Sequence, residues 1–190
     1  MARHTCRRSS HSHPRALLRW GLLTLWLTLA VAPLNPAPVH AFTPVRPILA
    51  WYYGWYTGPE SWVKTSDLPP ELYNSYDDAT MRRQIRQARA AGIDGFICTW
   101  RYNCERLLDL AAEEGGFGVA ISVDPVATTM PTLDAVEAVL HQVGQVTAHP
   151  AYLRWTDGRP VIVFWASHIL PQDSSVDAFR RLRDATDPNR

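Results

Sequence analysis

Aromatic and polar side chains follow four apolar runs of this sequence, and together they have the chemistry of a sugar-binding surface. Aromatic rings stack on the apolar face of a pyranose, whereas amide, carboxylate and imidazole groups hydrogen-bond its hydroxyl groups. The candidate contact residues are Tyr53, Trp55, Trp100, Tyr102, Asn103, Trp165 and His168. For the aromatic residues up to Tyr102, the sequence leaves open whether they contact a ligand or fill the core.

Asp124 is the candidate for a catalytic carboxylate. It directly follows the apolar run 118–123 and precedes Pro125. Its side chain either points toward a substrate or caps the segment that follows, and we expect the first. Hydrolysis of a glycosidic bond usually needs two carboxylates about 5 to 10 Å apart. Asp124 alone is well placed, so we predict a supporting role for it.

Other catalytic chemistries have no motif in this sequence. Phosphate loops, the GxSxG nucleophile elbow and the HExxH zinc pair do not occur. We expect His168 to be a hydrogen-bonding loop residue rather than a base. We expect neither a metal nor a cofactor.

The elements that must position these residues alternate between strands and helices. Strands are predicted at residues 48–53, 95–100, 118–123 and 161–165, and helices at residues 77–91, 105–114, 133–147 and 176–185. Such alternation implies parallel β/α units. In a β/α barrel the functional residues lie at the carboxyl ends of the strands, which is where the candidates fall.

The expected fold class is α/β, with the first four units of a TIM-type (β/α)₈ barrel that is apparently truncated. Eight units typically need about 250 residues, more than residues 42–190 provide. The Asp157-Gly158 pair between two apolar runs predicts a hairpin before the fourth strand. Trp51 and Tyr52 are expected in the core, with one of the two facing the helices.

Residues 1–41 have the composition of a signal peptide. Arginines without any acidic residue precede the apolar stretch 17–31, and a small-residue cleavage site ends at Ala41. We therefore expect a secreted or extracytoplasmic domain at residues 42–190. The stretch is shorter than the roughly 20 residues of a membrane span, so no stable span is expected after cleavage. An uncleaved anchor is the alternative.

The charge of the chain without its leader argues against one class of partner. All 18 acidic residues lie beyond the leader, whereas five of the 19 basic residues lie within it, so residues 42–190 carry a net negative charge. Nucleic acid is therefore not an expected partner. Cys98 and Cys104 could form a disulfide in an oxidising compartment. Because Cys98 lies in an apolar run, we expect a buried free thiol instead.

Four segments resemble, in their order and spacing, the barrel of the glycoside hydrolase family 99 endo-α-mannosidases and their bacterial relatives. They are WYYGWY (51–56), AGIDGFICTW (91–100), GFGVAISVDP (116–125) and HPAYLRWTDGRPVIVFW (149–165). The resemblance covers roughly residues 48–187. It implies a retaining, metal-independent glycosidase that hydrolyses α-mannose-type linkages within glycans.

The resemblance also implies roles for single residues. Asp124 matches the family's carboxylate after the third strand, where Glu is usual, and Tyr53 and Trp100 match substrate-contacting aromatics. The family's main catalytic glutamates belong to a later segment, beyond Arg190. We therefore expect this chain to be incomplete and inactive alone. The alternative is a non-catalytic sugar-binding or interaction fragment.

Overall fold

The computed structural model describes residues 46–126, 130, 132–169 and 175–186. The predicted signal peptide lies outside the described residues. Within them, no helix is both long enough and apolar enough to cross a membrane.

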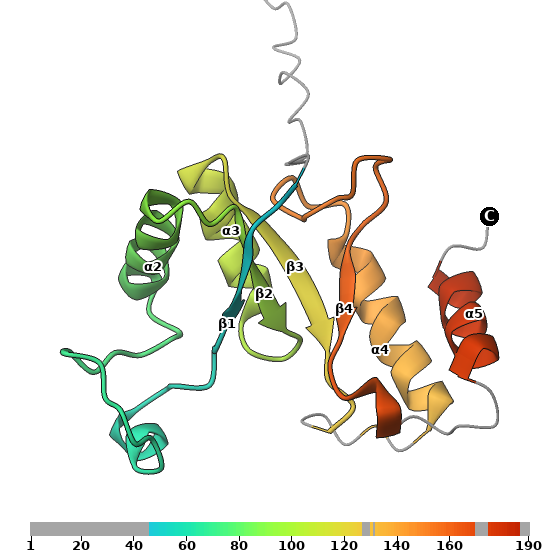
Figure 1. Ribbon diagram of the computed structural model, residues 1–190, viewed down its shortest axis with the longest axis horizontal. Coiled ribbons are helices and arrows are strands. Elements are labelled where there is room, and N and C mark those ends of the chain that lie inside the picture. Colours follow the sequence, from blue (N-terminus) through green and yellow to red (C-terminus); the bar gives the residue numbers. More distant parts are fainter. Residues whose placement is uncertain (1–45, 127–129, 131, 170–174, 187–190) are drawn as a thin grey trace, which may run out of the picture. The chain divides into compact units, whose positions relative to one another are not determined.

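The described strands form one parallel sheet in chain order (Figure 1). The register places Trp51 beside Ile97, and Ile97 beside Ala120. The strands are β1 (Leu49–Tyr52), β2 (Gly95–Thr99), β3 (Gly118–Val123) and β4 (Ile162–Phe164). Each of the first three strands is followed by a helix and then by its parallel neighbour, which confirms the predicted barrel-type β/α units.

The long helices lie close to their predicted bounds. Two begin at predictable caps: the Asp77 carboxylate accepts a hydrogen bond from the Thr80 amide at 2.7 Å, and the Thr132 hydroxyl accepts one from the Ala135 amide at 3.2 Å. The long helices are α2 (Asp78–Ala90), α3 (Cys104–Glu114), α4 (Leu133–Val146) and α5 (Ser175–Thr186). Two short 3₁₀ helices are η1 (Pro59–Trp62) and η2 (Ser167–Ile169).

One face of the sheet packs against the helices. Phe96 and Cys98 of β2 belong to a single core cluster with Met81 and Ile85 of α2. Val119, Ile121 and Val123 of β3 belong to the same cluster. Because side chains alternate along a strand, Ile97, Ala120 and Ser122 face the other side of the sheet.

That other face is concave. The rings of Trp51 and Trp165 lie 5.3 Å apart, edge to face, although they come from β1 and from the end of β4 at opposite edges of the sheet. In a flat sheet those edges would be about 14 Å apart, so the contact indicates strong curvature. Tyr52 is buried on the helix side, as predicted for one of the pair, whereas Trp51 is only half-buried and lies on the concave face.

The predicted hairpin before β4 is present as a tight turn. Arg154 and Pro160 form an antiparallel bridge, and the Trp155 amide donates to the Arg159 carbonyl at 2.8 Å. Gly158 has φ of 85°, which favours glycine at this turn. The turn places Trp155 before β4, at the opposite end of that strand from Trp165.

Arginine side chains form ion pairs between α2 and α3 and between α4 and α5. Arg86 of α2 donates to Glu114 of α3 through Nε at 2.8 Å and Nη2 at 2.7 Å. Arg181 of α5 donates to Asp134 at 2.5 Å and to Glu137 at 2.9 Å, both in α4. Figure 1 shows the same pairing, with α2 beside α3 and α4 beside α5.

Candidate functional site

Three aromatic side chains meet at the carboxyl ends of β1 and β2. The ring of Trp55 lies 4.6 Å from that of Tyr53 and 5.6 Å from that of Tyr102. Tyr53 is 51% exposed and Trp55 is 38% exposed, so the group presents ring surface to solvent. We call Tyr53, Trp55 and Tyr102 the aromatic cluster. It lies at the edge of the sheet where β/α barrels bind their substrates.

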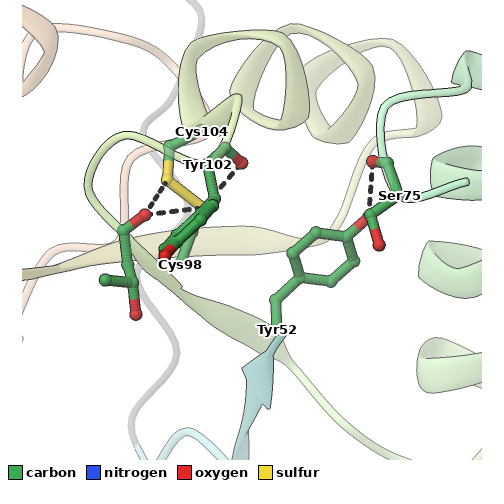
Figure 2. The surroundings of a disulfide bond; sticks show 6 residues. Tyr52, Ser75, Cys98, Tyr102 and Cys104 are labelled. Carbon is green, nitrogen blue, oxygen red and sulfur yellow. Dashed lines mark hydrogen bonds between the residues drawn. A yellow bond between two sulfur atoms is a disulfide. The ribbon is translucent and has the colours of Figure 1, made fainter. Parts of the chain in front are cut away.

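The loop after β1 is tied back to the strand by buried Ser75. The Ser75 hydroxyl donates to the Tyr53 carbonyl at 3.2 Å, and its amide donates to the Tyr56 carbonyl at 2.6 Å. The Tyr52 hydroxyl donates to the Ser75 carbonyl at 3.2 Å (Figure 2). Burial raises the pKa of Tyr52 well above its usual range, so this hydroxyl remains a donor. The base of the aromatic cluster is therefore fixed.

A second group of rings supports the cluster from within the same loop. Tyr56 stacks on Trp62 at 3.9 Å and 11°, and Tyr73 meets Trp62 edge to face at 4.9 Å. Trp62 is buried. Trp62 and Tyr73 were not among the residues predicted to form the site, although aromatic residues within an otherwise polar stretch are a signal for a packed loop.

A disulfide joins Cys98 to Cys104, so the expectation of a free Cys98 thiol is wrong. The two Cα atoms are 5.9 Å apart, and both residues are buried. Cys98 does lie in a buried strand, but the chain turns at once after β2 and brings Cys104, the first residue of α3, to the same place. The bond lies at the base of the loop that carries Tyr102 (Figure 2).

The candidate residues in the loop closed by the disulfide point to different places. Tyr102 joins the aromatic cluster, whereas the Trp100 indole donates to the Gln142 side chain of α4 at 3.3 Å and packs on the helix-side core. Asn103 precedes α3 with φ of 56°, and its carbonyl accepts from the Leu107 amide. Trp100, Arg101 and Asn103 help to line a hollow of about 350 Å³, which no residue of the aromatic cluster lines.

Asp124 and Trp165 are neighbours in register at the ends of β3 and β4. Asp124 is half-buried, and its Oδ1 accepts a hydrogen bond from the Val126 amide at 2.9 Å. This oxygen therefore caps the next turn, which was the alternative to a substrate-facing role. The Trp165 amide donates to the Val123 carbonyl at 3.0 Å, and its side chain is 54% exposed. His168 is exposed in η2.

Among the residues that the structure describes, no three His, Cys, Asp or Glu side chains are grouped in a way that could hold a metal ion.

Two solved structures of the family 99 endo-α-mannosidase from Bacteroides thetaiotaomicron resemble this chain. The structure in complex with Bis-Tris-propane is 23% identical over 65% of this chain and 43% of that chain, with a TM-score of 0.57. A second structure is 21% identical over 68% and 46% of the two chains, with a TM-score of 0.54. This chain thus spans less than half the length of these enzymes. No family model and no curated protein matches it. At this level of identity the comparison establishes the fold: the chain has a partial β/α barrel like that of the family 99 endo-α-mannosidases.

Proposed function

We propose that this chain is the glycan-binding part of an exported, family 99-like glycoside hydrolase that acts on α-mannose-containing glycans. The observation that carries the proposal is the solvent-exposed aromatic cluster on a barrel fold of this kind. Its three rings offer apolar surface on which a sugar ring can stack. The cluster lies at the edge where barrel enzymes bind substrate.

Polar groups of the same edge would complete the sugar site. Asn103 and His168 are proposed hydrogen-bonding partners, and Asp124 is proposed as a supporting carboxylate beside Trp165. Trp100 is proposed to contribute through the hollow that it lines, because its indole nitrogen is engaged by Gln142. Hydrolysis needs two suitably spaced carboxylates. We assign no such pair here, and we expect this chain alone to bind glycans without turnover.

Export is part of the proposal. The leader-like composition of residues 1–41 supports it, and so does the disulfide between Cys98 and Cys104, since such bonds persist in oxidising compartments. Amino-terminal sequencing of the mature protein tests it. We expect the mature chain to begin at Phe42, and recovery of an intact leader from the soluble protein would contradict cleavage.

Sugar binding is tested by titrating the full chain with α-linked mannotriose in a calorimeter. We expect saturable binding that Trp55→Ala weakens about tenfold, because an aromatic stack contributes on the order of 1.4 kcal/mol. Trp155→Ala is the matched control. Trp155 is also exposed, at 51%, but it precedes β4, whereas the aromatic cluster lies at the carboxyl ends of β1 and β2. Equal losses in the two variants, or equal affinity for cellotriose, would refute an α-mannose site at the aromatic cluster.

A non-catalytic interaction fragment is the second candidate. A largely apolar groove of about 390 Å³ runs between α4, α5 and β4, and Phe164 and Phe179 are among its lining residues. Phe179 is 38% exposed. If the groove binds a second copy of this chain, sedimentation of the purified protein should show association that Phe179→Ser abolishes. A monomer that binds mannotriose would favour the glycan proposal.

A further inference from the structure

We propose that Gly54 and the Cys98–Cys104 disulfide are positioning elements that set the spacing between the two halves of the aromatic cluster. One half, Tyr53 and Trp55, belongs to the loop after β1, and the other half, Tyr102, belongs to the loop after β2. This inference rests on the proposed glycan-binding function. It concerns residues that would act through the rings rather than touch the sugar.

Gly54 lies where the two loops touch. A Cβ atom built at this position would come within 2.7 Å of Tyr102 Cβ and 2.9 Å of the Tyr102 carbonyl oxygen. Gly54 is buried, and its φ is outside the left-handed range. Glycine is therefore needed here for space and not for backbone conformation. Any side chain at Gly54 must push the Tyr102 loop away from the loop that carries Trp55.

The disulfide holds the other side of the contact. It closes the segment 98–104 between the end of β2 and the start of α3, and Tyr102 lies inside that ring. Arg101, before Tyr102, has φ of 94°, which is uncommon for a residue with a side chain and indicates that its surroundings hold it there. Asn103, after Tyr102, has φ of 56°, a left-handed conformation that Asn adopts more readily than most residues. The Tyr102 amide also donates to the Thr99 carbonyl at 3.2 Å. The loop therefore has little freedom to follow a displaced neighbour.

Gly54 and the disulfide both affect the distance between the rings of Trp55 and Tyr102. Trp55 touches Tyr53 within its own loop and Tyr102 across the gap between the loops. A side chain at Gly54 would open the contact across the gap and leave the contact within the loop in place. Loss of the disulfide would instead let Tyr102 move while Gly54 still permits close approach. Both changes would reduce the ring surface that a sugar meets as one continuous platform.

The test compares full-length Gly54→Ala with Gly144→Ala. A Cβ at Gly144, in α4, meets nothing within 4 Å, so this control adds the same methyl group in open space. Near-ultraviolet circular dichroism reports the coupling among the cluster rings, and mannotriose titration reports binding. We expect Gly54→Ala to keep the far-ultraviolet spectrum, change the near-ultraviolet spectrum, and bind about fivefold more weakly. Gly144→Ala should match the wild type in all three measurements.

The outcomes separate this inference from the proposed function. Wild-type near-ultraviolet signal and affinity in Gly54→Ala would overturn the positioning role. If Gly54→Ala does not fold, Cys98→Ala/Cys104→Ala decides by mannotriose affinity alone, because removing the disulfide also removes its own near-ultraviolet signal. If the wild type does not bind mannotriose, the glycan proposal fails and the near-ultraviolet spectra decide alone. A changed spectrum in Gly54→Ala would then support the link between the loops, and an unchanged one would overturn it.

Discussion

Replacing Cys98 and Cys104 together by alanine should lower the free energy of unfolding by about 3 kcal/mol. The bond joins residues six positions apart, so it closes a short ring. For a ring of about seven residues the loss of chain entropy in the unfolded state corresponds to about 2.4 kcal/mol at 25 °C. Removing two buried sulfur atoms adds on the order of 1 kcal/mol, since both residues are almost fully buried.

Thermal unfolding measures this loss directly. For a domain of this size each kcal/mol moves Tm by about 2 to 4 °C, so we expect Tm to fall by about 6 to 12 °C. Thiol titration in denaturant provides the chemical control. A mature chain that begins at Phe42 contains two cysteines, Cys98 and Cys104, and we expect neither to react before reduction and both to react afterwards.

Two results would refute this reasoning. Reaction of all cysteines before reduction would show that the bond is absent from the folded protein. If the wild type contains the bond and the double variant nevertheless has the same Tm, the ring does not restrict the unfolded chain.

Three further predictions concern single residues. Ser122→Ala should leave the free energy of unfolding unchanged or raise it by up to about 1 kcal/mol, because the buried Ser122 hydroxyl has no hydrogen-bond partner among the described residues; a clear loss in urea unfolding would contradict this. Gly144→Ala should raise that free energy by about 1 kcal/mol, because alanine is the better helix former and α4 leaves room for its methyl group. Glu114→Gln should flatten the acid limb of the stability curve. Hydrogen bonding from Arg86 lowers the pKa of Glu114 below its ordinary value of 4.5. The ion pair therefore stabilises the fold above pH 4.5 and loses its effect as pH falls through the lowered pKa. Equal acid unfolding profiles for the wild type and Glu114→Gln would exclude this contribution.

Local signals predicted the elements of this fold well. Asp77 precedes a helical pattern that ends before Gly92, and the structure begins α2 directly after Asp77 and ends it at Ala90. The chemistry of helix caps acts within a few residues, so the sequence contains all of it. The order of the parallel strands also followed from the alternation of strands and helices. What the sequence predicted less well depends on contacts between distant segments.

Trp100 and Cys98 illustrate this limit. The period-two alternation of β2 places Phe96, Cys98 and Trp100 on the same face, and that face packs on helices. The alternation could have indicated that Trp100 turns away from Tyr102. No such local rule predicts that the chain folds back within six residues to bring Cys104 against Cys98. The contact between Trp51 and Trp165 likewise depends on how strongly the whole sheet curves.

The arginine bridges between α2 and α3 and between α4 and α5 give the helix layer a sensitivity to ionic strength that the sheet does not share. Exposed ion pairs are screened by dissolved salt, whereas the strand hydrogen bonds of β3 lie among residues that are all buried. Concentrated salt should therefore favour partial opening at the helix surface before the sheet is affected. Amide hydrogen exchange would show this as faster exchange in α2 and α5 with unchanged protection in β3. In such a protein the stability of the sheet would stay the same between low and high salt, whereas the stability of the helix layer would change.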